Sequence, residues 1–228
     1  MTLFTKLLAP AGLALTALAA LPVHAQVEGR VATVDISRTI IATTAFQQAY
    51  EQVNQTYTQQ NDLRRTKAQE RQTLLATFDT NGDKQVDDAE LAAKQNSGDF
   101  TKLQTLEQEI QALNNQIDGA RIYAIEQIIV HYGAALQDVT TAQQIKLVID
   151  PGSLLFAVPE ADVSQQVTTA LNGKVASVGV VPPAGWQPSR EGAQLYQEIQ
   201  QRLLTAQMMQ QQQQQQAQQG NTAAPVGR

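Results

Sequence analysis

Residues 103–124 have the sequence LQTLEQEIQALNNQIDGARIYA. Apolar side chains recur in this stretch at alternating steps of three and four residues: Leu103, Leu106, Ile110, Leu113, Ile117, Ala120 and Ala124. This spacing places them along one face of a helix, and it predicts a coiled-coil seam that a second helix must cover.

The C-terminal part of this predicted helix carries a second apolar stripe beside the first: Ile122, Ile125, Ile129, Tyr132 and Leu136. A helix that is apolar over most of its circumference must be buried on several sides. We therefore expect the base of the helix to lie in a packed body, whereas its earlier part has only a two-helix seam to bury.

The partner helix is predicted upstream, over residues 44–78. Neither glycine nor proline interrupts this run, and its apolar positions again recur at three- and four-residue steps: Phe46, Ala49, Tyr50, Val53 and Tyr57. No proline lies between Val23 and Asp150, although proline costs about 3 kcal/mol inside a helix. Residues 44–119 are therefore expected to form a long antiparallel coiled-coil hairpin, about 50 Å in length at 1.5 Å per residue.

Short β segments flank this predicted hairpin. Residues 31–36 and 145–150 are rich in β-branched side chains, and residues 153–158 are a third strand candidate. A short helix is expected over residues 159–172. Three short strands make a sheet too small to be stable alone, so oligomerisation is the expected remedy. The predicted fold class is α+β and mostly α, with a small β body and a long helical arm.

The C-terminal extension, residues 173–228, has a different composition. Pro182, Pro183, Pro188 and the single tryptophan, Trp186, lie in a stretch that is expected to be irregular. Helical spacing returns over residues 190–209. The glutamine-rich remainder, residues 210–228, is predicted to be disordered.

The first 25 residues have the pattern of a secretory signal peptide. Lys6 precedes an apolar run, and residues 23–25 (VHA) fit a small-residue cleavage site. Pro10 and Gly12 interrupt the run, which is shorter than the roughly 20 residues of a membrane-spanning helix. We expect cleavage after Ala25, a mature chain outside the cytoplasm and no stable membrane insertion.

Composition excludes several classes of function. There is no cysteine, so thiol nucleophiles and cysteine-bound metals are ruled out. Cleavage would leave His131 as the only histidine, and its apolar helical surroundings predict a packed structural residue. No phosphate-binding loop and no G-x-S-x-G motif occurs, which argues against an enzyme and against a nucleotide cofactor. The formal net charge of −5 argues against a nucleic acid partner.

The order of these parts, together with residues 31–35 (VATVD), 144–150 (QIKLVID) and 162–172 (DVSQQVTTALN), resembles the Skp/OmpH family of periplasmic chaperones. The resemblance implies a homotrimer, in which strands from three chains form a small barrel-like body and three helical hairpins surround a cavity. It also implies a periplasmic, ATP-independent holdase for unfolded outer-membrane β-barrel proteins. Residues 26–43 and 120–172 would then form the trimerisation body, and residues 44–119 the arm.

Residues 79–90 (DTNGDKQVDDAE), at the tip of the predicted hairpin, have the spacing of an EF-hand calcium loop. The oxygen donors at positions 1, 3, 5, 7, 9 and 12 would come from Asp79, Asn81, Asp83, the Gln85 carbonyl, Asp87 and Glu90. Lys84 departs from the pattern at position 6, where glycine normally permits a sharp turn. A residue other than glycine that is forced to positive φ costs on the order of 1 kcal/mol or more, and lysine adds a cation, so affinity should be lower. The alternative is an acidic turn that caps two helices, since Asp, Asn and Gly are common in turns.

The predicted arms carry little net charge. Acidic residues nearly balance Arg64, Arg65, Lys67 and Arg71 on the first helix, and glutamine fills most other exposed positions. Strong electrostatic capture of clients is therefore not expected, and many weak polar and apolar contacts are the alternative. Two functions remain: a trimeric holdase, or a calcium-binding structural or adaptor protein of the cell envelope.

Overall fold

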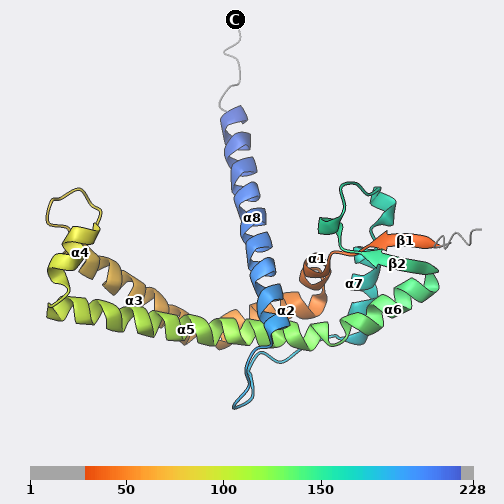
Figure 1. Ribbon diagram of the computed structural model, residues 1–228, viewed down its shortest axis with the longest axis horizontal. Coiled ribbons are helices and arrows are strands. Elements are labelled where there is room, and N and C mark those ends of the chain that lie inside the picture. Colours follow the sequence, from red (N-terminus) through yellow and green to blue (C-terminus); the bar gives the residue numbers. More distant parts are fainter. Residues whose placement is uncertain (1–28, 222–228) are drawn as a thin grey trace, which may run out of the picture.

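The computed structural model describes residues 29–221. The predicted signal peptide, residues 1–25, and the last seven residues, 222–228, lie outside the described residues. A body of short elements continues into a long helical arm, and a separate helix rises from the junction between them (Figure 1). None of the described helices is long and apolar enough to cross a membrane.

The body contains a two-stranded parallel sheet of β1 (Arg30–Thr33) and β2 (Ile145–Ile149). Both strands were expected from the sequence, but β1 ends earlier than predicted. The carboxylate of Asp35 accepts the N–H of Arg38 at 2.9 Å and so caps helix α1 (Ile36–Ile41). Because of this cap, Ile36, the last residue of the predicted strand, is the first residue of helix α1.

The prediction of a third strand over residues 153–158 is wrong. A short 3-10 turn, η1 (Pro151–Ser153), follows β2, and an irregular segment leads to a second turn, η2 (Pro159–Ala161). A strand needs a hydrogen-bonded neighbour, and the described part of the chain supplies none here. Helix α7 (Ser164–Lys174) begins after η2, later than predicted, and continues through the expected stop at Asn172-Gly173.

The arm consists of α2 (Thr44–Thr56), α3 (Thr58–Ala76), the short α4 (Asp88–Lys94) and α5 (Gly98–Ile129). α3 runs beside α5 in the opposite direction, since Lys67 forms an ion pair with Glu109 and Arg64 donates a hydrogen bond to Asn114. The single helix predicted over residues 44–78 is interrupted at Tyr57, which has a φ of −104° and a ψ of 27°.

The predicted seam on α5 is buried at most of its positions. Ile110 and Leu113 are half-buried, and the other members are buried: Leu103, Leu106, Ile117, Ala120 and Ala124. The base of α5 lies in the main core, as its second apolar stripe predicted: Ile122 and Ile125 are buried there, and Ile129 is partly buried against it. Ile128, which is not part of that stripe, is buried there as well. The arm is therefore attached to the body by one continuous helix.

Helix α5 ends earlier than the apolar pattern suggested. A break at Val130 and His131 separates it from α6 (Tyr132–Ala142), which turns back toward the sheet. Val130 is 76 % exposed, and His131 is also exposed. The expectation of a packed structural His131 is therefore wrong, because the side chain lies at a helix junction instead of inside a helix.

The C-terminal extension is more ordered than predicted. Residues 175–189, here called the strap, are irregular, as their prolines suggested: they pass beside α5 and form a loop that projects from it before α8 begins (Figure 1). Helix α8 (Arg190–Asn221) then continues well beyond Met209 into the glutamine run. Glutamine is a good helix former and no proline interrupts this run, so an already anchored helix can continue through it.

Candidate functional site

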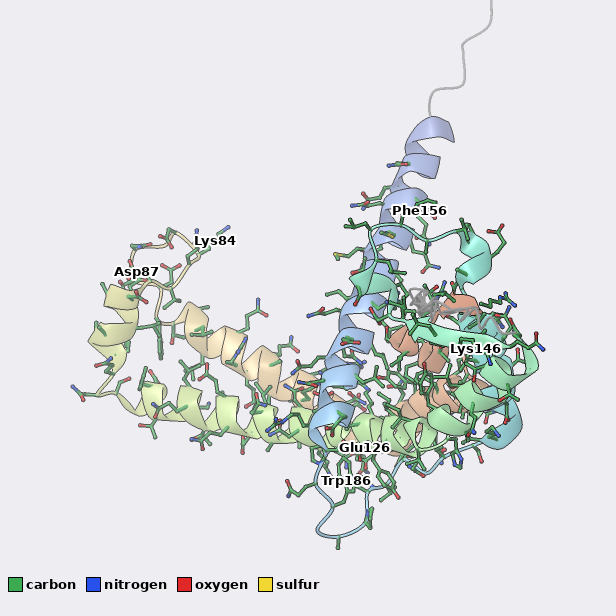
Figure 2. The ribbon with its side chains drawn as sticks, turned by 45° about the vertical axis from the view of Figure 1, so that its right-hand side comes forward. Lys84, Asp87, Glu126, Lys146, Phe156 and Trp186 are labelled. Atoms are coloured by element: carbon green, nitrogen blue, oxygen red, sulfur yellow. The ribbon has the colours of Figure 1, made fainter. Side chains whose placement is uncertain are left out.

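The predicted calcium ligands lie at the far end of the arm, in the loop between α3 and α4 and, for Glu90, in the first turn of α4 (Figure 2). Oxygen atoms of three side chains shape this loop by accepting backbone N–H groups at 2.6–2.8 Å. Asp79 accepts those of Gly82 and Lys84, Asn81 accepts that of Asp83, and Asp83 accepts that of Gln85. These bonds form a series of tight side-chain-closed turns.

Lys84 adopts the left-handed backbone conformation that position 6 of the pattern requires. Its φ is +66°, and nearby Gly82 has a φ of +79°. The Lys84 side chain is exposed at the rim of the loop (Figure 2). Because a lysine in this conformation is about 1 kcal/mol less favourable than a glycine, the loop carries backbone strain at this residue.

Glu90 closes the loop from its other end. Its Oε1 accepts hydrogen bonds from the N–H of Thr80 at 2.7 Å, the hydroxyl of Thr80 at 2.8 Å and the N–H of Asn81 at 3.2 Å. Its Oε2 accepts the N–H of Asp87, and Asp87 accepts the N–H of Glu90 in return, which forms a capping box on α4. These bonds, led by the one from the Thr80 N–H, hold the pKa of the Glu90 carboxyl below its ordinary value.

The acidic side chains of the loop do not converge on one point. Within residues 29–221, no group of three or more His, Asp or Glu side chains lies close enough together to hold a metal ion. The donors are hard oxygens of the kind that calcium takes, so their chemistry fits that ion. To complete such a site, Glu90 would have to exchange its bonds to Thr80 and Asn81 for the ion.

The remaining surface of the arm is mainly polar. No residue of α3 is fully buried, and Leu63 is 46 % exposed. Two shallow grooves, with volumes of 390 and 590 Å³, lie along the arm and are lined chiefly by Thr, Gln, Glu and Asn side chains. Because one hydrogen bond contributes only about 1 kcal/mol net, such a surface can hold an extended chain only through many weak contacts.

The body exposes large apolar side chains. Leu155 is fully exposed, Phe156 is 81 % exposed, and Val31 and Leu147 on the sheet are 44 % and 45 % exposed. Val31 and Leu147 are partners in the sheet register, and Leu155 and Phe156 are adjacent in the sequence, so they form two exposed apolar pairs that are candidates for contact with a partner. Residues 153–158 have the apolar composition that predicts a strand, but the structure leaves Leu155 and Phe156 exposed on an irregular segment instead.

The strap is fixed to α5 by specific contacts at its middle and end (Figure 2). The side-chain amide of Gln127 donates to the carbonyl of Gly179 at 2.8 Å and accepts its N–H at 3.0 Å. Trp186 packs edge-on against Tyr123, with 5.4 Å between the ring centroids. Glu126 accepts the N–H of Ser189 at 2.7 Å, which anchors the start of α8. Trp186 and the prolines were the only sequence signals of this arrangement.

A polar network joins α8 to the base of the arm. The hydroxyl of Tyr196 donates to Asp118, which pairs with Arg121 at 3.3 Å, and Gln200 donates to the hydroxyl of Tyr50 at 3.0 Å. Burial, together with the hydrogen bond to Asp118, raises the pKa of Tyr196 to about 12. Burial also raises the pKa of Tyr50. The neutral forms of both tyrosines are therefore part of the folded structure.

These elements define a class of protein in which a small β body carries a projecting helical hairpin. The chain belongs to the family described as "Outer membrane protein (OmpH-like)", whose sequence model matches residues 30–171. The strap and α8 lie beyond the matched residues.

Three chains of solved structures also match. One is a crystal structure of a candidate outer membrane chaperone (OmpH-like) from Caulobacter crescentus CB15, with 14 % sequence identity and a TM-score of 0.44. The match covers 74 % of this chain and 100 % of that chain. No curated protein matches this sequence.

Proposed function

We propose that this protein is a periplasmic, ATP-independent holdase chaperone. It would bind unfolded outer-membrane β-barrel proteins in a cavity between the arms of a homotrimer and prevent their aggregation. Membership of the OmpH-like family, matched over residues 30–171, supports a chaperone role and argues against an enzyme. The proposal requires no nucleotide and no nucleic acid partner.

The observation that carries the proposal is an arm that stands clear of the body (Figure 1) and carries two shallow grooves lined chiefly by Thr, Gln, Glu and Asn residues. A holdase must keep chains apart and later release them without an energy source. Many weak contacts meet both requirements, because each contact of about 1 kcal/mol can break separately. The absence of a fully buried residue in α3 leaves that helix free to adjust to different clients.

The small sheet and the exposed apolar side chains of the body support assembly into a homotrimer. β1 and β2 form a sheet of only two strands, and within residues 29–221 no further strand covers its outer edges. Apart from the contacts of Thr33 with Asp162 and Val163, the edges of this sheet have no hydrogen-bonded partner in the described residues, and exposed apolar side chains such as Leu155 and Phe156 also favour association. In this proposal residues 26–43 and 120–172 form the shared body, and residues 44–119 form the arm of each copy.

Aggregation of a β-barrel client tests the holdase directly. A urea-unfolded outer-membrane β-barrel protein is diluted into buffer with or without the mature protein, without nucleotide, and light scattering is followed. Scattering should be suppressed at about one trimer per client, the ratio expected of a closed symmetric assembly. Undiminished scattering at a large excess of the protein would refute the holdase and favour the alternative of a structural or adaptor protein of the envelope.

A second candidate property is the binding of one calcium ion per chain at the tip. It is favoured by the bend of the loop at Lys84, whose N–H the carboxylate of Asp79 accepts. The ligands would be Asp79, Asn81, Asp83, the Gln85 carbonyl, Asp87 and Glu90. Bound calcium would neutralise the crowded carboxylates and fix the angle between α3 and α4.

Calorimetric titration with calcium chloride tests this second property. The mature protein should release or absorb heat at millimolar calcium, as expected of a weak extracellular site with a Kd of about 10⁻⁴ to 10⁻³ M. The matched control is Asp79→Ala, which removes the first ligand and should abolish the signal. Identical titrations of the two proteins would refute a site in this loop.

A further inference from the structure

The two ends of the β1–β2 sheet carry opposite charges. Because the strands are parallel, Arg30 and Lys146 lie at the amino end of the sheet, whereas Asp35 and Asp150 follow its carboxyl end. Both strands point from the outer side of the body toward α1 and α8 (Figure 1), and Lys146 lies on that outer side (Figure 2). Among residues 29–221, no carboxylate forms an ion pair with Arg30 or Lys146.

A groove with a volume of 560 Å³ lies at the acidic end, between α8 and the turn that follows β2. Its lining carries four carboxylates: Asp35, Asp150, Glu191 and Glu198. Arg202 also lines the groove, but it pairs with Asp35 at 2.7 Å and so neutralises only one of the four. Ile36, Ile129 and Leu195 add apolar lining. The groove therefore suits an occupant that is both cationic and apolar.

The wall formed by α8 is held in place before any occupant arrives. Ile199 is fully buried in the core, and Tyr196 and Arg202 bond to Asp118 and Asp35. Glu191 and Glu198 therefore project from a fixed helix, which makes the acidic surface preorganised. Both residues lie outside residues 30–171, the range that the family model matches.

We propose that the acidic groove receives the amino end of the sheet of a second copy of this chain. Lys146 and Arg30 of that copy would face Asp150, Glu191 and Glu198, and its half-exposed Val31 and Leu147 would meet the apolar lining. This inference rests on the homotrimer proposed above and names a contact that closes it. The two surfaces are different patches of one chain, so the contact is head-to-tail, and such contacts can repeat around a closed ring.

A second copy is favoured over other occupants because the complementary surface is present on the chain itself. Its charge is opposite to that of the groove, and its apolar side chains lie beside its cations. Opposite charges across an interface fix its register and speed association, whereas like charges oppose it. A cationic segment of a client is the competing occupant, and it is treated as an outcome of the test.

Charge reversal on each side of the proposed contact provides the test. Association of protomers is measured by sedimentation equilibrium at low ionic strength, where surface charges are least screened. Lys146→Glu and Glu198→Lys should each weaken association by about tenfold or more. The double variant, which restores opposite charges, should associate almost as tightly as the original protein. Arg71→Glu makes the same change of charge on the exposed arm and should have no effect.

Each outcome decides the proposal. Single reversals without effect would overturn it, and so would single reversals that weaken association without rescue in the double variant. Reversals that leave the mass unchanged but reduce retention of a lysine-rich client would assign the groove to clients and overturn it as well. The scattering assay distinguishes failure of this proposal from failure of the holdase proposal. If the original protein forms an oligomer and suppresses aggregation but the charge reversals have no effect, only the proposed contact between copies is refuted. If the original protein does not suppress scattering, the holdase is refuted.

Discussion

Replacing Ile199 by alanine measures how much α8 contributes to the fold. Ile199 is fully buried in the main core, where α8 packs against α1 and α5. The substitution removes three carbon atoms, worth about 2.4 kcal/mol at 0.8 kcal/mol for each buried carbon group. The cavity left behind adds to this loss, so we expect about 3 kcal/mol in the free energy of unfolding. Leu204 on the same helix is 57 % exposed, and its replacement by alanine should cost less than about 0.5 kcal/mol.

Urea unfolding followed by circular dichroism provides the assay. Both variants and the original protein are compared at one protomer concentration, because association contributes to apparent stability. With a slope of about 2 kcal/mol per molar urea, Ile199→Ala should lower the midpoint by about 1.5 M. If Ile199→Ala shifts the midpoint no further than Leu204→Ala, α8 is not part of the core and the reasoning is refuted.

Three further predictions concern pH, backbone packing and the tip. The pKa of Tyr196 rises from about 10 in the unfolded chain to about 12 in the fold. Its contribution to stability is therefore complete below about pH 10 and is lost as the pH rises toward 12. Between these two pH values the urea midpoint of Tyr196→Phe should fall less steeply with pH than that of the original protein. An equally steep fall in both proteins would contradict the assignment of this titration to Tyr196. A Cβ at Gly192 would lie 2.4 Å from Oε1 of Glu126, so Gly192→Ala should break the bond to Ser189 and cost about 1–2 kcal/mol in thermal unfolding. Gly133→Ala, which meets open space, is its control, and equal effects would count against the anchor. Lys84→Gly should relieve the strain of the left-handed backbone conformation and remove a cation. The affinity for calcium, measured by calorimetry, should therefore rise about tenfold. An unchanged affinity would show that Lys84 does not limit calcium binding.

The elements that depend on neighbouring residues were predictable from the sequence. The strand from Ile145 and the buried seam on α5 both follow from local periodicity and end signals. The positive φ of Lys84 also followed from its place in the loop pattern. In each case the pattern that predicts the element lies within the element itself.

The elements that depend on distant contacts were not predictable. The helix break at Tyr57 lies where its side chain reaches the strap, with the hydroxyl donating to the carbonyl of Val180 at 3.4 Å. The exposed state of Leu155 and Phe156 depends on the absence of a neighbouring strand in the described chain, although their composition favours a strand. The engagement of Glu90 with Thr80 likewise requires the loop to fold back on itself.

The mass of the complex between the mature protein and one unfolded β-barrel client, measured by native mass spectrometry, tests the central claim most directly. The account predicts three protomers bound to one client, because a shared body places three arms around it. A complex with a single protomer for each client, or a protein that remains monomeric at working concentration, would contradict that account.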